Sequence, residues 1–297
     1  MSGANAADTA LREAGLDSVE VRSLLRATLA EDLGIVGDLT SAATVPAEAR
    51  LRVAYVARGA GVVCGLPVLA VLAEEVGDLD LLVADGDAVV PGQRVAVLEG
   101  PARDVLRIER TSLNLLGHLS GVATATRAWV DAVEGTGARI RDTRKTLPML
   151  RSLQKYAVRC GGGVNHRRGL DDAILVKDNH VSAAGGIGPA VDAALAAHPD
   201  GSVVVQVEVD SLDQLDEALA HGATQVLLDN FGTDRLVAAV ERVRRTHPGV
   251  LLEASGGLTL ARAREVAATG VDFLAVGALT HSSPALDIGL DVDTDNG

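Results

Sequence analysis

The chain contains few aromatic residues, cysteines and lysines, and each shortage excludes a class of structure. Aromatic residues make up only 2% of the 297 residues, so aliphatic side chains must fill the core. The two cysteines, Cys64 and Cys160, are too few for a disulfide framework and do not have the spacing of metal ligands. This usage is typical of a protein from a reducing compartment.

Long hydrophobic runs and an excess of positive charge are missing as well. No apolar run approaches the roughly 18 residues of a transmembrane helix, and the N-terminal segment has neither the basic nor the apolar region of a signal peptide. The formal net charge of −13 argues against nucleic acid or an anionic membrane as a partner. We therefore expect a cytoplasmic protein that binds neither.

The lysines that are present stand close together. All three, Lys145, Lys155 and Lys177, fall between residues 139 and 180, a stretch that holds ten basic and only four acidic residues. Lysine is a compact ammonium with an adjustable pKa, whereas arginine is a wide and permanently charged fork. A positive region in an acidic chain predicts a site for a small, multiply charged anion.

Residues 1–115 have the pattern of an α+β domain with a small antiparallel sheet. A helix is expected over residues 17–33, with Asp17 and Glu20 as a capping pair and Gly34 as its stop. Short alternating runs predict a small antiparallel sheet. These runs cover residues 51–57, 61–64, 79–84 and 89–98, and a further helix is expected over 67–76.

Residues 116–285 alternate between apolar strands and amphipathic helices, after a helix over 104–133 that is expected to break near 117–121. The expected strands are residues 138–142, 173–176, 203–209, 225–228, 250–254 and 272–276. The expected helices are residues 148–159, 187–198, 212–221, 234–246 and 260–269. Six such βα units predict parallel strands with outer helices, as a barrel or as a doubly wound sheet.

The length of this second part favours an incomplete α/β barrel of six or seven strands, because a full eight-stranded barrel takes about 250 residues. The remaining residues, 286–297, form a separate tail. Its alternating pattern over 286–292 predicts a strand that returns to the first domain.

Polar or glycine-rich groups follow nearly every strand of the second part. Active sites of α/β barrels lie at the C-terminal ends of the strands, so we expect these groups to converge; the alternative is that they are ordinary polar loops. The groups are Thr143-Arg144-Lys145, Lys177-Asp178-Asn179-His180, Glu208 with Asp210, Asp229-Asn230, Ser255-Gly256-Gly257 and Gly277-Ala278.

The groups are of three kinds. The cationic kind consists of Arg144, Lys145, His166, Arg167 and Lys177, of which the arginines can clasp a carboxylate or phosphate through two hydrogen bonds. Two further cations stay ambiguous. Arg110 on the preceding helix either joins this group or is solvated, and Lys155 either faces solvent or supports phosphate contacts.

The anionic kind consists of Glu208 and Asp229, and the third kind consists of glycine loops. Two carboxylates that face a cationic pocket predict Mg²⁺ brought in with a substrate phosphate, with ion pairs to the lysines as the alternative. The loops at 255–257 and 276–278 offer backbone N–H groups to a phosphate. Together the three kinds suit transfer of a phosphorylated sugar to an anionic acceptor, in which placement and electrostatics supply most of the rate.

Several motifs support this hypothesis through a family resemblance. They are Asp142-Thr-Arg-Lys-Thr-Leu-Pro148, Gln154-Lys-Tyr-Ala-Val-Arg159, Gly161-Gly-Gly-Val-Asn-His-Arg167, Lys177-Asp-Asn-His180, Glu208-Val-Asp210, Leu228-Asp-Asn-Phe231, Glu253-Ala-Ser-Gly-Gly257 and Val276-Gly-Ala-Leu-Thr-His281. The earlier segments Glu31-Asp-Leu-Gly34 and Gly37-Asp-Leu-Thr-Ser41 also fit. In this order, over nearly the whole length, the chain closely resembles the quinolinate phosphoribosyltransferase family.

The resemblance implies a pentosyltransferase of NAD biosynthesis. Its reaction joins quinolinate to phosphoribosyl pyrophosphate and releases nicotinate mononucleotide, pyrophosphate and CO₂, with Mg²⁺ as cofactor. The resemblance also implies an α/β sandwich joined to an incomplete barrel. A homodimer with shared active sites is implied as well, with a hexamer as the alternative.

The resemblance further implies roles for individual residues. Arg144, His166, Arg167 and Lys177 hold the carboxylates of quinolinate, and Arg110 reaches the partner's pocket. The groups that hold phosphoribosyl pyrophosphate and Mg²⁺ are Lys145, Glu208, Asp229, Ser255, Gly256, Gly257, Val276, Gly277 and Ala278. Thr143 and His281 complete the binding residues. The implied catalytic residues are Lys145, Lys177, Glu208 and Asp229, of which the last two are the metal ligands.

One departure and three rival functions stay open. Gln206 stands where many family members carry an acid, which weakens the metal assignment. The first rival is a Schiff-base enzyme of the aldolase type that uses Lys177. The second is a related phosphoribosyltransferase for another anionic acceptor, and the third is a non-catalytic sensor of phosphoribosyl pyrophosphate.

Overall fold

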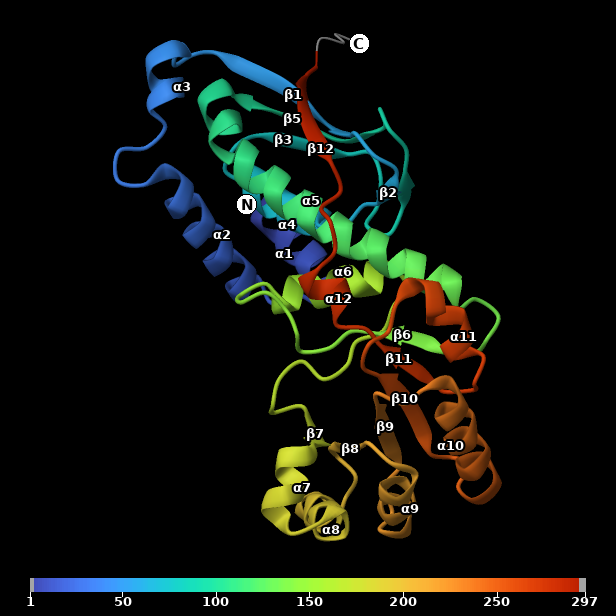
Figure 1. Ribbon diagram of the computed structural model, residues 1–297. Helices are drawn as coiled ribbons and strands as arrows, with labels where there is room; N and C mark the ends of the chain where they lie inside the picture. The colour runs from blue at the N-terminus through green and yellow to red at the C-terminus, as the bar shows by residue number, and fades with distance from the viewer. Residues whose placement is uncertain (1–2, 294–297) are drawn as a thin grey trace. The chain divides into compact units, whose positions relative to one another are not determined.

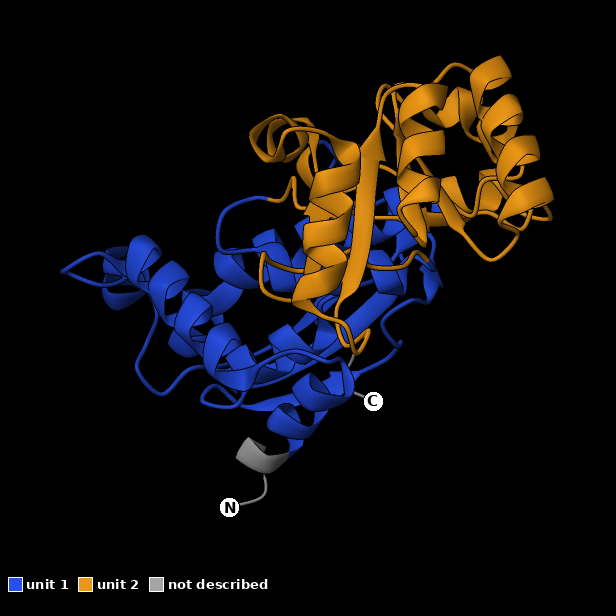
Figure 2. Cartoon of the chain, turned by 90° about the horizontal axis from the view of Figure 1, so that it is seen from below, with its two compact units in different colours: residues 1–127, 147–162, 282–297 blue, residues 128–146, 163–281 orange. Residues whose placement is uncertain are grey.

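The computed structural model describes residues 3–293 and divides the chain into two compact units. Unit 1 comprises Met1–Arg127, Leu147–Gly162 and Ser282–Gly297, and unit 2 comprises Ala128–Thr146 and Gly163–His281 (Figure 2). The units therefore group the chain differently from the expected division at residues 115 and 285. In particular, Leu147–Gly162 belongs with unit 1, although it lies between segments of unit 2 in the sequence.

Unit 1 is built around a four-stranded sheet in the order β12-β1-β5-β3, in which all pairs are antiparallel. The strands are β1 (Arg50–Ala57), β3 (Asp78–Leu81), β5 (Arg94–Pro101) and β12 (Ile288–Val292), and a two-stranded sheet adds β2 (Gly61–Val62) and β4 (Ala88–Val89). The expected strand in the C-terminal tail is confirmed, because Val53 pairs with Val292 and Ala57 with Ile288. Residues 294–297 of the expected tail lie outside the described residues.

The described helices that begin in unit 1 are α1 (Gly3–Glu13), α2 (Ser18–Leu33), α3 (Leu39–Thr44), α4 (Leu66–Ala73), α5 (Ala102–Ala132) and α6 (Arg151–Cys160) (Figure 1). The last residues of α5, from Ala128, belong to unit 2. The expected cap of α2 is confirmed, since the Asp17 side chain accepts a hydrogen bond from the Glu20 N–H and Gly34 ends the helix at φ 53°. Among the described residues, no helix is both long enough and apolar enough to cross a membrane.

The expected break in α5 near residues 117–121 is wrong, because the helix runs unbroken from Ala102 to Ala132. Its glycines have another cause. A Cβ atom on Gly121 would lie 2.1 Å from the Pro284 carbonyl oxygen, and one on Gly117 would lie 2.9 Å from that of Leu286. The returning tail segment thus passes so close to α5 that only glycine fits.

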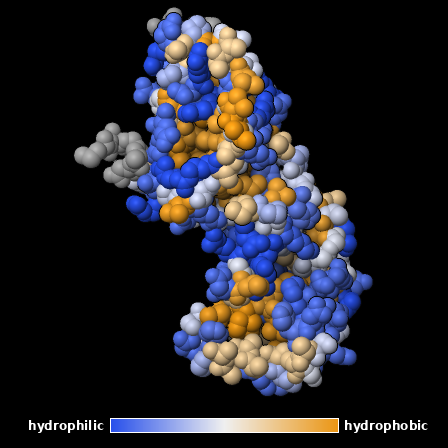
Figure 3. Space-filling model, turned by 90° about the vertical axis from the view of Figure 1, so that its left-hand side faces the viewer, coloured by the Kyte–Doolittle hydropathy of each residue, from blue (hydrophilic) through white to orange (hydrophobic). Residues whose placement is uncertain are grey.

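Apolar side chains are exposed on one part of unit 1. Val19, Ile35, Val36 and Leu39, on α2 and between α2 and α3, are 67% to 104% exposed. Figure 3 shows apolar side chains at the surface on the side of the molecule that carries these helices. An exposed apolar group of this kind often marks an interaction surface.

Unit 2 contains six parallel strands in the order β6-β11-β10-β9-β8-β7. They are β6 (Arg139–Arg141), β7 (Ala173–Val176), β8 (Val204–Val209), β9 (Gln225–Asp229), β10 (Leu251–Ser255) and β11 (Phe273–Ala275). The first strand thus pairs with the last, as in a barrel, and the sheet is open between β6 and β7. This confirms the expected incomplete α/β barrel, with six of the expected six or seven strands.

The helices of unit 2 are α7 (Asp178–Ala184), α8 (Ile187–Ala197), α9 (Leu212–Ala220), α10 (Thr233–Thr246), the 3₁₀ turn η1 (Leu260–Arg262), α11 (Ala263–Ala267) and α12 (Ala278–His281). Helix α8 packs on β7 and β8, α9 on β8, and α11 on β11 (Figure 1). Side chains on the opposite face of the strands are therefore left to line the interior. Helix α7 was not expected from the sequence.

Candidate active site

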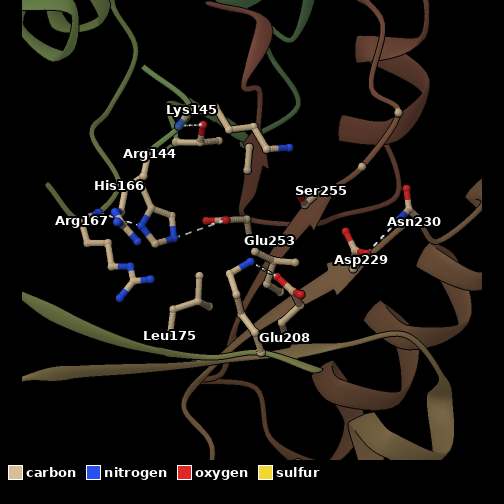
Figure 4. A pocket seen from close by; sticks show the side chains of 16 residues that line it. Arg144, Lys145, His166, Arg167, Leu175, Glu208, Asp229, Asn230, Glu253 and Ser255 are labelled. Atoms are coloured by element: carbon tan, nitrogen blue, oxygen red, sulfur yellow. Dashed lines mark hydrogen bonds and ion pairs between the residues drawn. The ribbon is translucent and has the colours of Figure 1, made fainter. Parts of the chain in front are cut away.

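A cavity of about 660 Å³ lies at the carboxyl ends of the unit 2 strands (Figure 4). All of its lining residues belong to unit 2. They are Thr143, Arg144, Lys145, His166, Arg167, Leu175, Lys177, Glu208, Leu227, Asp229, Asn230, Glu253, Ser255, Gly256, Gly257 and Ala275. The structure thus brings together eleven of the sequence-predicted site residues, which include both cationic and anionic side chains.

The period of the strands explains why these side chains share one cavity. In β8, Val205, Val207 and Val209 are buried against the helices, so Glu208 faces the interior, because successive residues of a strand alternate sides. The register of the strands places residues of neighbouring strands at the same depth in the cavity. Glu208 pairs with Leu227, and Asp229 pairs with Ser255 on the next strand.

The same period accounts for the lining residues that the sequence analysis did not identify. Leu175, Leu227, Glu253 and Ala275 each belong to a strand, and the first three stand two residues before Lys177, Asp229 and Ser255. They form the layer below the polar strand ends. A count of two residues back from each predicted strand-end residue would have found them.

Two guanidinium groups dominate the cationic side of the cavity. Burial and the neighbouring Arg144 cation lower the pKa of Arg167, whereas Asp172 acts in the opposite direction. Arg167 is held in place because its guanidinium donates a 3.0 Å hydrogen bond to the Ala173 carbonyl. Two like charges so close together in a half-buried cavity create a positive potential that an anion would relieve.

The Arg167 loop is fixed from below by Asp142, whose side chain is fully buried. Its carboxylate accepts hydrogen bonds from the Asn165 side chain at 2.6 Å and from the His166 N–H at 2.7 Å. A buried carboxylate held by two donors makes a rigid support. The loop therefore presents Arg167 from a fixed backbone.

His166 is held by protein partners on both ring nitrogens. The Arg167 N–H donates to Nδ1 at 2.7 Å, so the hydrogen of the neutral ring lies on Nε2. Nε2 in turn donates to the Gln206 Oε1 at 2.7 Å and lies 3.6 Å from the Glu253 carboxylate (Figure 4). His166 therefore forms part of the cavity wall, with both ring nitrogens engaged by protein groups.

Glu253 closes the floor of the cavity and is 1% exposed. Burial raises its pKa, while the Arg141 guanidinium, 2.7 Å from the carboxylate, acts in the opposite direction. Arg141 also stacks on the Phe273 ring, with its guanidinium carbon 4.0 Å from the ring centre. Arg141 is therefore a support for the floor, which leaves Arg144 and Arg167 as the arginines of the cavity itself.

The carboxylates are arranged differently from each other. Glu208 pairs with the Lys177 ammonium at 2.7 Å, which is the ion pair considered as an alternative to metal binding. Asp229 accepts a hydrogen bond from the Asn230 side chain at 2.7 Å. Both carboxylates line the cavity, and carboxylate oxygens are among the ligands that Mg²⁺ prefers.

The loop at 255–257 requires glycine. Gly256 and Gly257 have φ values of 89° and 59°, which favour glycine, and a Cβ atom on Gly256 would lie 2.1 Å from the Asn230 side-chain oxygen. The loop therefore exposes backbone next to Asp229. Such a loop suits close approach of a phosphate.

The remaining predicted site residues do not line the cavity. Val276, Gly277, Ala278 and His281 lie beside it in unit 2, where the Thr280 hydroxyl donates to the Lys145 carbonyl at 2.9 Å and Gly277 packs against the Lys145 side chain. Arg110 lies on α5 in unit 1. Lys155, also in unit 1, is 4% exposed, so its solvent-facing alternative is wrong.

Comparisons with known proteins agree with this geometry. The family model of the quinolinate phosphoribosyl transferase N-terminal domain matches residues 38–120, and that of the C-terminal domain matches residues 122–291. A nicotinate-nucleotide pyrophosphorylase [carboxylating] of Mycobacterium leprae is 51% identical over 91% of this chain and 96% of that protein. A quinolinate phosphoribosyltransferase [decarboxylating] of Nicotiana tabacum is 34% identical over 93% of this chain and 83% of that protein.

A solved structure gives the same result. The nicotinate-nucleotide pyrophosphorylase from Francisella tularensis superposes with a TM-score of 0.87 at 37% identity, over 94% of this chain and 98% of that one. Sequence motifs, two domain models, full-length relatives and the fold thus agree. The chain belongs to the quinolinate phosphoribosyltransferase family.

Proposed function

We propose that this protein transfers the phosphoribosyl group of phosphoribosyl pyrophosphate to quinolinate with loss of CO₂. The products are nicotinate mononucleotide and pyrophosphate, and the reaction belongs to NAD biosynthesis. The observation that carries the proposal is that cationic side chains, carboxylates and a glycine loop line the same cavity. Two arginines and two lysines share it with three carboxylates and a glycine loop, which suits a dianionic ring beside a diphosphate.

Quinolinate carries two carboxylates on neighbouring ring carbons, and Arg144 and Arg167 suit one carboxylate each. Lys177, at the end of β7, adds a compact charge near the same ring. His166 contributes its ring surface and a fixed orientation, because its nitrogens are engaged by the Arg167 N–H, Gln206 and Glu253. This differs from direct carboxylate binding by His166, which the family resemblance implied.

Phosphoribosyl pyrophosphate suits the opposite side of the cavity. Lys145 and the loop at 255–257 offer a cation and backbone N–H groups to its phosphates. Glu208 and Asp229 would hold Mg²⁺, which when bound neutralises charge on the departing pyrophosphate. Lys177 already pairs with Glu208, so Lys177 would turn towards quinolinate as Glu208 turns towards the metal.

The residues then act mainly by placement and charge. The quinolinate nitrogen attacks C1 of the ribose as the C1–O bond to pyrophosphate breaks, and Lys145 stabilises the charge that develops on the leaving oxygen. The pyridinium that forms withdraws electrons, so the carboxylate next to the nitrogen leaves as CO₂ and the ring carbon takes up a proton. No covalent bond to the protein is needed.

The rival Schiff-base reaction at Lys177 fits this site less well. The Lys177 ammonium would first have to break its ion pair with Glu208. The two arginines and the glycine loop of the cavity would not take part in that reaction. A carbonyl substrate trapped on Lys177 by borohydride would revive it.

We further propose that the protein is a cytoplasmic homodimer in which Arg110 reaches the pocket of the partner. The exposed apolar side chains of Val19, Ile35, Val36 and Leu39 provide surface for such an association. Analytical ultracentrifugation tests the dimer. Mixing Arg110→Ala with Lys145→Ala protein tests site sharing, because a shared site restores activity in the mixed dimer.

The test of the reaction uses purified protein, Mg²⁺, phosphoribosyl pyrophosphate and quinolinate labelled at the carboxyl group next to the nitrogen. We expect labelled CO₂ and nicotinate mononucleotide in equal amounts, and neither when nicotinate replaces quinolinate. Lys145→Ala is expected to lower turnover at least about 100-fold with unchanged circular dichroism. Product formation from nicotinate, without CO₂, would reject quinolinate as the acceptor.

A further inference from the structure

The two cysteines of the chain meet inside unit 1, although they are far apart in the sequence. Cys64 lies between β2 and α4, and Cys160 is the last residue of α6. Their sulfur atoms and an oxygen of the Asp85 carboxylate all lie within 4.8 Å of one another. None of these residues belongs to the cavity of unit 2.

Hydrogen bonds fix both sides of this cluster. The Cys64 backbone exchanges two bonds with the Ser120 hydroxyl, at 3.0 and 3.3 Å. One turn before Cys160, the Tyr156 hydroxyl donates to Asp85 at 2.7 Å. Asp85 also accepts from the Gly65 and Leu66 N–H groups at 3.0 Å, so it joins the start of α4 to α6. The two sulfur atoms are therefore held close by groups on either side of them.

The environment favours sulfur chemistry over metal binding. A metal ion would need the Asp85 carboxylate, whose two oxygens already accept bonds from Gly65, Leu66 and Tyr156. Binding would leave those buried donors without an acceptor, which is costly. A disulfide requires only the two sulfur atoms and leaves the Asp85 bonds intact.

The two thiols are not equivalent. Cys64 is 0% exposed, and burial raises its pKa well above the ordinary value. Cys160 is half-buried, and the hydrogen bond that it receives from the Cys64 thiol lowers its pKa despite burial. Since the thiolate is the form that reacts with peroxides, Cys160 is the sulfur that reacts first with an oxidant.

We propose that Cys160 and Cys64 form a peroxide-sensitive thiol pair that closes to an intramolecular disulfide. The Cys160 thiolate attacks hydrogen peroxide, breaks its O–O bond and becomes a sulfenic acid, with release of hydroxide. The Cys64 sulfur then displaces the sulfenic oxygen, so one S–S bond forms and one S–O bond breaks. The sulfenic OH group and the Cys64 proton leave together as water. The bond ties the end of α6 to the start of α4.

The test uses the full chain, reduced and then treated with hydrogen peroxide, and blocked with N-ethylmaleimide under denaturing conditions. Intact mass is then measured without reductant. We expect a protein lighter by two hydrogen atoms that takes up no maleimide and regains two reactive thiols with dithiothreitol. Because the chain has only two cysteines, this mass change has one assignment.

Two variants test the order of events. In Cys64→Ser, Cys160 is expected to stop at the sulfenic acid and to be trapped by dimedone, at a level at least about tenfold above wild type. In Cys160→Ser, folded protein is expected to keep an unmodified Cys64 over the same time. Circular dichroism checks that each variant is folded, and the wild-type mass change stands without them.

Three results would overturn the pair. These are two maleimide adducts after peroxide treatment, a disulfide between chains on a non-reducing gel, or stoichiometric zinc that must be chelated before the thiols react. None of these outcomes involves the cavity of unit 2. The proposed transferase reaction therefore stands or falls separately from the thiol pair.

Discussion

At the scale of single residues, the electrostatics of Arg167 are the most informative feature of the cavity. Its pKa is lowered by burial and by the Arg144 cation, so the protein keeps two like charges close together in a half-buried place. Although Asp172 acts in the opposite direction, an anion bound between the two guanidinium groups would relieve their repulsion. Because both arginines line the cavity, this pair fits the binding of an anionic ligand.

Replacing Arg167 by alanine is expected to weaken quinolinate binding roughly 10- to 100-fold, because a hydrogen bond to a charged group contributes about 1.5–3 kcal/mol. Lysine at this position should restore only part of the affinity, since it lacks the planar fork. Isothermal titration calorimetry measures both. The control is Arg168→Ala, at an exposed neighbour that does not line the cavity; equal losses in Arg168→Ala and Arg167→Ala would contradict the assignment.

A second residue-scale prediction concerns His118, whose pKa is lowered by burial. The Gln154 side-chain oxygen accepts the Leu147 N–H, so its nitrogen faces His118 Nε2 at 2.9 Å, and the ring must be an acceptor there. The unfolded chain thus binds the proton more readily. The neutral His118 ring therefore contributes fully to the stability of the folded state above the unfolded pKa of about 6.5. This contribution is lost as the pH falls below that value.

His118→Gln keeps an acceptor without titrating. Between about pH 7 and about pH 5, the melting temperature of wild type is therefore expected to fall further than that of His118→Gln. The exposed His247→Gln serves as the control and should follow wild type. Parallel melting curves for wild type and His118→Gln across this range would show that His118 does not titrate as proposed.

At the scale of elements, the sequence predicted the strands of unit 2 to within one or two residues, because buried parallel strands are continuous apolar runs with clear limits. It failed at α5, where glycine was taken as a helix break. The cause of Gly117 and Gly121 lies in residues 284–286, and no local pattern reveals a close approach of distant chain segments. Helix α7 was missed because its residues were interpreted only as a strand-end loop.

Gly121→Ala distinguishes a glycine that only weakens the helix from a glycine that the close approach of Pro284 requires, because the two explanations predict opposite changes in stability. In a helix that meets no neighbour, this change stabilises by about 1 kcal/mol. Because the new Cβ would lie 2.1 Å from the Pro284 oxygen, we expect a loss of roughly 1–3 kcal/mol of unfolding free energy instead. Asn114→Ala, at an exposed position of α5, is the matched control for helix propensity, and urea denaturation followed by circular dichroism measures both.

At the scale of the whole molecule, the two-part architecture and the returning C-terminal strand were predictable, but the place of α6 was not. Its sequence is typical of a barrel helix, yet its partners lie in unit 1. Ser152 donates to Glu20, Tyr156 to Asp85, and Gln154 contacts His118. Each bond joins residues far apart in the chain, and their pairing follows from tertiary packing, which hydrophobic periodicity does not encode.

The candidate site was largely predictable because the topology of a barrel brings the C-terminal ends of its strands together on one face. Eleven predicted residues line the cavity. The layer beneath them follows from the two-residue period of the strands, whereas the partners that engage the His166 nitrogens depend on tertiary contacts. The charges of the lining could be read from the sequence, whereas the hydrogen-bond partners that decide which side chains remain available to a ligand could not.

The most direct test of the central claim is a crystal structure of the protein with quinolinate. The account predicts one quinolinate in the unit 2 cavity, with its carboxylates on the Arg144 and Arg167 guanidinium groups and its ring beside His166. Quinolinate bound elsewhere, or bound in the cavity with both carboxylates away from these two arginines, would contradict it.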